Sequence, residues 1–312
     1  MKQVLIIKYC NLEDEFQYRL DSYHNFTTKI SKIPGVEVKS YGYKHKDYSE
    51  DKTIWDVVTM LYGKYYYPDV IYLWSPQALK ESDFTKLPSR KYLFWTDTPS
   101  TNGILVDGIK KHKVKFNAVF HNYLYELDVL KDIVDAERFE HHPCWSSDIY
   151  DYDGREKTID FLLTGTITSE YEFRSKYKNL IHLLEGVTVD RLGMINNQED
   201  DNNKFKDSLL SSKFSLVDGG VNGRVVPRYF ESSLAKSVVV SPDLGKELEV
   251  NGFKDGINCI LFDRNDSYEN IAKKINESAR DWERLSENAY DLVYNNHTTD
   301  KRIEALIKGF RD

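Results

Sequence analysis

The chain has 312 residues, 40% hydrophobic and 30% charged, which is enough for two domains of ordinary size with real cores. Its formal net charge of -7 argues against a protein devoted to duplex nucleic acid, although one basic run remains at residues 110–115. No window approaches the ~18 apolar residues of a membrane span, and the first apolar run is too short for a signal peptide. The three cysteines are far apart without metal-ligand spacing, which is typical of a reducing, cytoplasmic location.

The first half of the chain alternates short apolar runs with amphipathic segments. Apolar runs predict strands, and periodic segments predict helices. The strands are expected at Val4–Ile7, Val36–Tyr43, Val70–Trp74, Lys91–Trp95 and Asn117–Phe120, and the helices at Asp14–Ile30, Asp51–Tyr65 and Tyr123–Val134. Such alternation predicts right-handed crossovers and a mostly parallel sheet.

The same alternation restarts after a polar segment without periodicity, Tyr150–Lys157. The second set of strands is expected at Thr158–Leu163, Val187–Leu192, Phe214–Val217, Ser237–Ser241 and Cys259–Phe262, with helices at Tyr171–Leu184, at Lys204–Ser211 and from Pro227, and three amphipathic helices after Phe262. Two successive α/β units of ~150 residues predict two domains, with a boundary at residues 150/151.

The region that organises the second unit is a glycine-rich turn, Asp218–Arg224, followed by a short helix and a buried strand. Such a turn brings main-chain N–H groups close to a ligand. Pro227 suits a first helical turn, and Glu231 is a carboxylate near the start of an otherwise close-packing helix. The alternative for Glu231 is a charge favoured by the helix dipole. Arg228 could equally form a structural salt bridge with Glu231 or Asp243.

These residues carry a family resemblance. Arg228 to Glu231, then Leu234-Ala235, an apolar strand and Pro242–Leu248 resemble the donor-site region of GT-B glycosyltransferases. The pattern looks most like the group named after spore maturation protein B, near glycosyltransferase families 1 and 4. Further similar segments are Asp160–Gly165 with Arg174, and His297-Thr298 with Arg302.

The resemblance implies the fold and the domain organisation. It implies an α/β protein of the GT-B type, with two Rossmann-like domains facing across a cleft. Residues 1–150 would be the acceptor side and residues 151–296 the nucleotide-sugar side. Residues 297–312 would form a helix that packs back on the first domain.

The resemblance also implies an activity. The chain would be a hexosyltransferase-type glycosyltransferase (EC 2.4) that moves a sugar from a nucleotide-diphosphate sugar, such as a UDP-sugar, with retention and without metal ion or cofactor. Glu231 would bind the ribose hydroxyls of the donor. The acceptor stays open among a glycan, a protein, a small molecule and a modified base, so nucleic acid is not excluded.

Breaking the bond to a diphosphate requires stabilisation of the leaving group's charge, which helix N-termini, loop N–H groups and arginines can supply without a metal. Two strand–turn–helix units carry suitable residues: Gly165, Thr166 and Arg174 in one, and Gly220, Arg224 and Arg228 in the other. As alternatives, Arg174 is a solvated charge, and Gly165 with Thr166 is an ordinary turn and helix cap.

Two residues of the first half are candidates for catalysis. Asp97 and His121 each follow an expected strand at the edge where ligands of open α/β sheets collect. Asp97 would orient an acceptor hydroxyl or act as a base, or else cap the next segment. His121 has a hydrogen-bonded structural role as its alternative. His141-His142 is predicted to be part of the linker.

One departure from the family pattern bears on mechanism. Many retaining relatives have a second glutamate eight positions before the ribose-binding one, and here that position is Gly223, with Asp218 five residues earlier. Lys236 also stands where relatives usually have glycine. The alternatives are therefore a GT-B-like binding or coat protein without turnover, and a nucleotide-sugar epimerase of the same fold.

Overall fold

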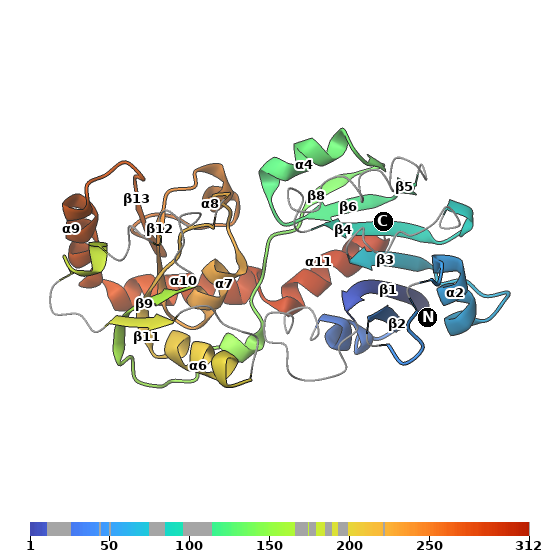
Figure 1. Cartoon of the computed structure of the whole chain (residues 1–312), viewed down its shortest axis with the longest axis horizontal. Coiled ribbons are helices and arrows are strands. Elements are labelled where there is room, and N and C mark those ends of the chain that lie inside the picture. The colour runs from blue at the N-terminus through green and yellow to red at the C-terminus, as the bar shows by residue number, and fades with distance from the viewer. Residues whose placement is uncertain are drawn as a thin grey trace. The chain divides into compact units, whose positions relative to one another are not determined.

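The computed structural model describes residues 1–10, 26–43, 45–49, 51–74, 85–95, 114–165, 174, 179–184, 189–192, 199–220 and 222–311. The chain divides into two compact units (Figure 1). Unit 1 comprises Met1–Glu15, Tyr23–Pro143 and Ile303–Asp312, and unit 2 comprises Phe16–Ser22 and Cys144–Arg302. The chain therefore passes between the units more than once, and its last residues belong to unit 1.

Unit 1 is built on a six-stranded parallel sheet of order β2-β1-β3-β4-β6-β8. The strands are β1 (Lys2–Cys10), β2 (Val36–Tyr43), β3 (Val70–Trp74), β4 (Arg90–Trp95), β6 (Ala118–His121) and β8 (Phe139–His141), while β5 (Lys115–Phe116) and β7 (Asp135–Ala136) pair separately. All five residues of β3 are buried, as expected for a central parallel strand covered on both faces.

Helices cover both faces of this sheet. On one face, α2 (Ile54–Tyr62) and α4 (Leu124–Lys131) share a core with alternate residues of the strands. A capping box between Thr53 and Asp56 starts α2, which explains why the helix begins there. On the other face, Phe310 of α11 (Thr299–Arg311) packs against Tyr92, with ring centroids 4.7 Å apart. Residues 26–31 are also helical, and Phe26 contacts Trp74.

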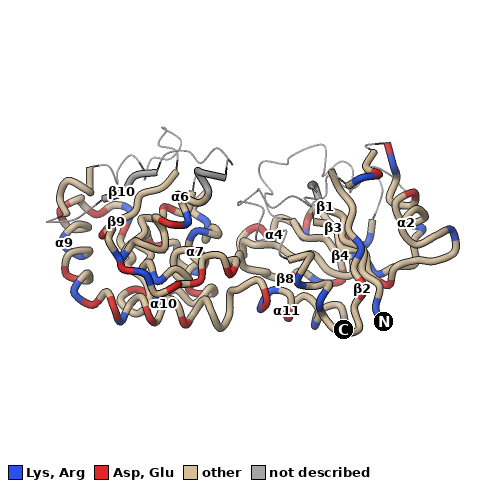
Figure 2. Tube along the Cα trace, turned by 90° about the horizontal axis from the view of Figure 1, so that it is seen from below, with Lys and Arg blue, Asp and Glu red and all other residues tan. Residues whose placement is uncertain are grey.

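Unit 2 has a five-stranded parallel sheet of order β10-β9-β11-β12-β13. Its elements are η3 (Asp148–Tyr150), β9 (Ile159–Thr164), β10 (Val189–Leu192), α6 (Glu199–Leu210), β11 (Ser212–Leu216), α7 (Pro227–Leu234), β12 (Val238–Pro242), α8 (Lys246–Val250), β13 (Cys259–Phe262), α9 (Tyr268–Ala279) and α10 (Trp282–Asn296). Residues of β9, β11, β12, β13 and α9 form one buried apolar cluster. Figure 2 shows acidic residues recurring along α10, which has one face in water.

Helix α7 ends in a Schellman motif, which joins it directly to β12. The N–H of Ser237 donates to Ser232 O at 2.8 Å, and the N–H of Lys236 donates to Ser233 O at 3.0 Å. Lys236 has φ 53°, the left-handed region that glycine usually occupies at this position. A lysine in this conformation costs about 1 kcal/mol of folding free energy relative to glycine, so the backbone is strained at this position.

The motif His297-Thr298 with Arg302 lies at the junction between α10 and α11. There Ser146 N–H donates to His297 O at 2.9 Å, and Thr299 N–H donates to Ser146 O at 3.1 Å. Arg302 is buried, its guanidinium contacts His297, and burial lowers its pKa to about 10. These residues therefore tie the start of unit 2 to its end.

Many expected elements are confirmed where the structure describes them. The bounds of three strands agree throughout: Val36–Tyr43, Val70–Trp74 and Cys259–Phe262. The interpretation of His141-His142 as linker is wrong for His141, because this residue lies in β8, an edge strand paired with β6. In the described part of the chain, no helix is long and apolar enough to cross a membrane.

Candidate functional site

The candidate site lies at one edge of the unit 2 sheet, where the carboxyl ends of its parallel strands meet. Ligands of open α/β sheets bind at this edge. Gly165 directly follows β9, the glycine-rich turn follows β11, and Arg264 follows β13. Strand order places these three segments at the same edge although they are far apart in sequence.

Gly165 and Arg174 are in direct contact. Gly165 has φ 100°, and a Cβ at this position would lie 2.6 Å from Arg174 Nη1 and 2.9 Å from Arg174 Cζ. A side chain would therefore collide with the guanidinium as well as strain the backbone. The absence of a side chain at Gly165 therefore allows the guanidinium to lie this close to the end of β9.

Asp218 holds Arg174 in this place. Arg174 Nε lies 3.1 Å from Asp218 Oδ2, and the Asp218 side chain is only 5% exposed. The other oxygen, Oδ1, accepts the N–H of Gly220 at 3.0 Å. The solvated-face alternative for Arg174 therefore does not hold. The N–H of Gly220 is also already used within the turn.

Arg228, in the first turn of α7, points to the end of β9. Its Nη1 donates to Thr164 Oγ1, and its guanidinium lies 4.7 Å from the centre of the Phe205 ring. Among the described residues, its buried Nε has no hydrogen-bond partner. An unsatisfied buried donor costs about 1–3 kcal/mol, which a ligand oxygen would relieve.

The glycine-rich turn brings in an arginine that sequence reasoning missed. The N–H of Arg224 donates to Gly219 O at 2.7 Å, which closes the turn. A Cβ on Gly223 would lie 3.0 Å from Nη2 of Arg264. The available signal was that Arg264 comes two residues after the strand ending at Phe262, at the same sheet edge. Gly223 thus lies beside a cation.

Glu231 stands on a rigid helix. It is half-buried in the second turn of α7, whose first turn contains no acidic residue. A dipole effect fades within the first turn, so it explains Glu231 poorly. The neighbouring Tyr229 and Phe230 are fully buried, and burial raises the pKa of Tyr229. The surrounding packing fixes the direction in which Glu231 leaves the helix.

His121 lies in unit 1, at the end of β6. Its ring is fully buried, Nδ1 accepts the N–H of Tyr123 at 3.0 Å, and Nε2 lies 3.2 Å from Glu126 Oε2. Both nitrogens thus have protein neighbours, as in the hydrogen-bonded structural role that the sequence left open. A catalytic role stays a prediction.

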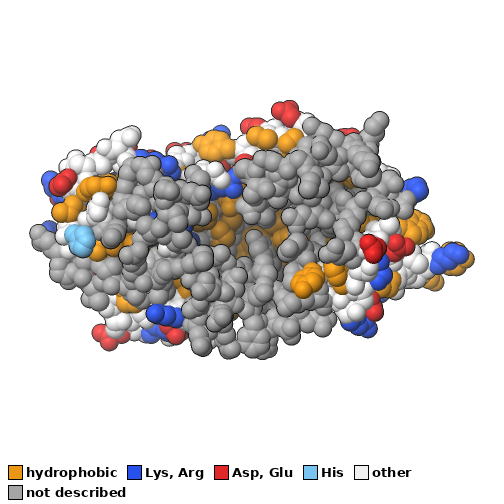
Figure 3. All heavy atoms as spheres, in the orientation of Figure 1, with side chains coloured by type: hydrophobic (Ala, Val, Ile, Leu, Met, Phe, Trp, Pro, Cys, Tyr) orange, Lys and Arg blue, Asp and Glu red, His pale blue; other side chains and the backbone are white. Residues whose placement is uncertain are grey.

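Two other expected site residues, Asp97 and Thr166, lie outside the described residues. Within the described ranges, no group of three or more His, Cys, Asp and Glu side chains is placed to hold a metal ion. On the face drawn in Figure 3, described basic and acidic side chains are interspersed.

Comparisons with known proteins find likeness in structure alone. The sequence matches no protein-family model and no curated protein. Sucrose-phosphate synthase from Thermosynechococcus elongatus superposes with a TM-score of 0.66 at 10% identity, covering 100% of this chain and 98% of that one.

Two further structures align over nearly full length. Anabaena HepE in complex with UDP has a TM-score of 0.65 at 10% identity, with 100% of both chains covered. The β-glucosyltransferase of phage T4 has a TM-score of 0.57 at 14% identity, with 99% of both chains covered. These neighbours are GT-B proteins, and the two parallel α/β units agree with them. The chain therefore has the GT-B fold, with two Rossmann-like units.

Proposed function

We propose that the chain is a glycosyltransferase that uses a nucleoside-diphosphate sugar as donor. The observation that carries the proposal is the arrangement of three arginines, Arg174, Arg228 and Arg264, at the carboxyl edge of the unit 2 sheet. Two of them lie against Gly165 and Gly223, and the third carries a buried, unsatisfied N–H among the described residues. Cations set against glycine turns suit an anionic diphosphate.

The chemistry of sugar transfer fits these side chains. The bond between the anomeric carbon and the diphosphate oxygen breaks, and negative charge accumulates on the departing nucleoside diphosphate. Guanidinium groups that are already positioned stabilise that charge without reorganising during the reaction. In this proposal they do so without a metal ion or cofactor. Glu231 accepts hydrogen bonds from the ribose hydroxyls.

The neighbours support the choice of donor. HepE was captured with UDP and with UDP-glucose, and another neighbour is a DNA-modifying β-glucosyltransferase studied with its substrate uridine diphosphoglucose. UDP-sugars are therefore the first donors to test. In the proposal, unit 2 binds the donor and unit 1 the acceptor. Retention of configuration and membership of the spore maturation protein B-like group are parts of the proposal that rest on the motif resemblance.

The test is calorimetric binding followed by turnover. We expect UDP to bind the full chain, and UDP-glucose or another UDP-sugar to be hydrolysed or transferred, with activity kept in EDTA. Binding without hydrolysis or transfer of any sugar nucleotide would favour the binding or coat protein. Interconversion of donor sugars without an acceptor would identify an epimerase. Loss of turnover in EDTA, restored by Mg²⁺ or Mn²⁺, would contradict metal independence.

A further inference from the structure

A pocket lies on unit 2, away from the arginines. Its volume is about 560 Å³, within the usual range for small-ligand sites. Its lining includes Tyr152, Lys236, Trp282, Glu283, Glu287 and Asn288.

The pocket lies at the amino-terminal edge of the sheet. Tyr152 precedes β9, Lys236 precedes β12, and Trp282 Nε1 donates to the carbonyl of Lys213, near the start of β11, at 2.9 Å. The six residues of β9 span roughly 20 Å at ~3.3 Å each. The pocket is therefore separate from the candidate donor site, which lies at the carboxyl ends of the same strands.

Two aromatic side chains give the pocket rigid apolar surfaces. Trp282 packs partly on the apolar core of unit 2, and its bond to Lys213 O fixes the indole. Tyr152 donates to Arg155 O at 2.6 Å, and the ammonium groups of Lys157 and Lys236 lie 4.8 Å and 5.4 Å from its ring centre. Both rings are thus held in place without a ligand.

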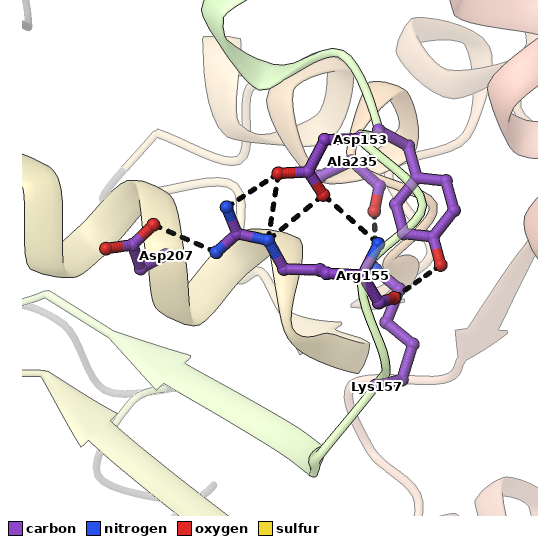
Figure 4. A network of polar contacts seen from close by, with 6 residues as sticks. Asp153, Arg155, Lys157, Asp207 and Ala235 are labelled. Atoms are coloured by element: carbon purple, nitrogen blue, oxygen red, sulfur yellow. Dashed lines mark hydrogen bonds and ion pairs between the residues drawn. The ribbon is translucent and has the colours of Figure 1, made fainter.

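A network of charges fixes the segment that carries Tyr152. Figure 4 shows Arg155 between Asp153 and Asp207, and Lys157 donating to Ala235 O. This network anchors the segment to α6 and to the end of α7. The wall formed by Tyr152 is therefore part of the folded unit.

The charges that line the pocket balance. Two cations, Lys236 and Arg284, stand with two carboxylates, Glu283 and Glu287. Lys236 forms an ion pair with Glu287, and Arg284 lies 3.0 Å from Asp281. A lining without net charge gives no attraction for a polyanion, and acidic side chains along α10 oppose one. It suits a neutral ligand with many hydroxyls and an apolar face.

We propose that this pocket binds one pyranose ring of a neutral saccharide. The C–H face of the ring packs on Trp282, because burying apolar surface against an aromatic ring is favourable. The hydroxyl groups bond to Glu283, Asn288 and the ammonium of Lys236, since a hydroxyl both donates and accepts. The inference goes beyond sugar transfer, because it requires no activity at the donor site.

The geometry of Lys236 supports this assignment. The lysine occupies a left-handed position that glycine would fill without strain, and its side chain reaches the pocket, contacting Tyr152 and Glu287. The ammonium group also lies 5.1 Å from the ring centre of Tyr290, and together these contacts hold it at the wall of the pocket.

The experiment measures saccharide binding to the full chain by saturation-transfer NMR and calorimetry. The probes are maltotriose, cellotriose and triacetylchitotriose, with trigalacturonate as the anionic comparison. The variants are Glu283→Ala and Lys236→Gly, the second of which also relieves the backbone strain. Glu269→Ala is the matched control, because Glu269 is likewise an exposed acid in the first turn of its helix, α9.

We expect at least one neutral trisaccharide to bind, with affinity at least tenfold weaker in both pocket variants and unchanged in Glu269→Ala. The affinity for UDP should be the same in all four proteins, which separates this result from the donor site. No binding of any neutral trisaccharide, or binding that both pocket variants leave intact, would overturn the proposal. Stronger binding of trigalacturonate would overturn the neutral ligand class.

Discussion

Arg174 and Asp218 form an ion pair that lies against Gly165, with Nε of the arginine 3.1 Å from Oδ2 of the aspartate. The pair joins the segment after β9 to the turn after β11, across neighbouring strands. Asp218 also bonds to the N–H of Gly220. The carboxylate thus orients both the cation and the turn, so it acts on the donor through Arg174 in the proposed function.

Replacement of Gly165 by alanine tests this contact. The new Cβ would displace the guanidinium of Arg174, 2.6 Å away. The loss of one charge-assisted contact weakens UDP binding roughly tenfold to a hundredfold. Calorimetric titration of the full-length variant with UDP measures the change.

Gly154→Ala is the matched control for that variant. Gly154 has φ 85°, but a Cβ there has no atom within 4 Å among the described residues. Both variants should lose about 1 kcal/mol of stability from the positive φ, and Gly154→Ala should bind UDP like the native chain. Equal losses of affinity in the two would show that backbone strain, not Arg174, is responsible.

Arg228→Lys keeps the positive charge and removes the planar fork. The contact with Phe205 and the directed bond to Thr164 Oγ1 depend on the guanidinium shape. We expect UDP affinity to fall by about tenfold, since one such contact is worth ~1.5 kcal/mol. Arg280→Lys, at an exposed position after α9, should bind normally. Unchanged binding in Arg228→Lys would reduce the role of Arg228 to a point charge.

The titration of Lys157 gives a prediction about pH and stability. Burial, above all, lowers the pKa of Lys157 to about 7. Between pH 7 and ~10.5 the unfolded chain therefore binds more protons at this residue than the folded chain, so this group makes stability rise with pH there. The slope is at most ~1.4 kcal/mol per pH unit for a single proton.

Lys157→Met removes this titration. The stability difference between the native chain and the variant should change in favour of the native chain from pH 7 to pH 9.5, and stay constant below pH 6. Chemical denaturation of the full chain measures it, with Lys273→Met as an exposed control on α9. A difference that does not vary with pH would show that Lys157 titrates normally when folded.

The local hydrophobic pattern predicted the longer strands of the two sheets. Segments that this pattern missed are strands because they pair with residues far away in the sequence. Val70–Trp74 is a compact apolar run between turn residues, so its bounds could be read from the sequence. Phe139–His141 is short and partly polar, and it is a strand because β6 offers an edge to pair with. No local signal distinguishes such a segment from linker.

The same distinction between local sequence pattern and long-range contacts applies to the candidate site. The sequence pointed to Arg174 and Arg228 through their position after strand–turn units. It did not reveal that Asp218 pairs with Arg174, because the two are 44 residues apart and meet only through strand order. Arg264 also follows a strand, β13, but its contact with the glycine-rich turn likewise depends on strand order. Lys236 could be recognised as a changed residue, but its left-handed backbone and aromatic contacts required the structure.

Glu231 is the sharpest test of the donor site. If its carboxylate accepts hydrogen bonds from both ribose hydroxyls, Glu231→Gln keeps the size and one acceptor oxygen but loses the charge. Charge-assisted bonds contribute ~1.5–3 kcal/mol, so UDP affinity should fall roughly tenfold to a hundredfold. Glu249→Ala, an exposed acid on α8, should leave affinity unchanged.

A double cycle distinguishes binding from helix stabilisation. Glu231→Ala should weaken UDP binding more than Glu231→Gln, yet change little for 2′,3′-dideoxyuridine diphosphate, because that ligand lacks the hydroxyls. Calorimetry on both proteins with both ligands gives the coupling energy between side chain and hydroxyls. Glu231 lies beyond the first turn of α7, so its removal should cost less than ~1 kcal/mol of helix stability through the dipole. Additive losses without coupling would mean that Glu231 does not contact the ribose and that the donor lies elsewhere.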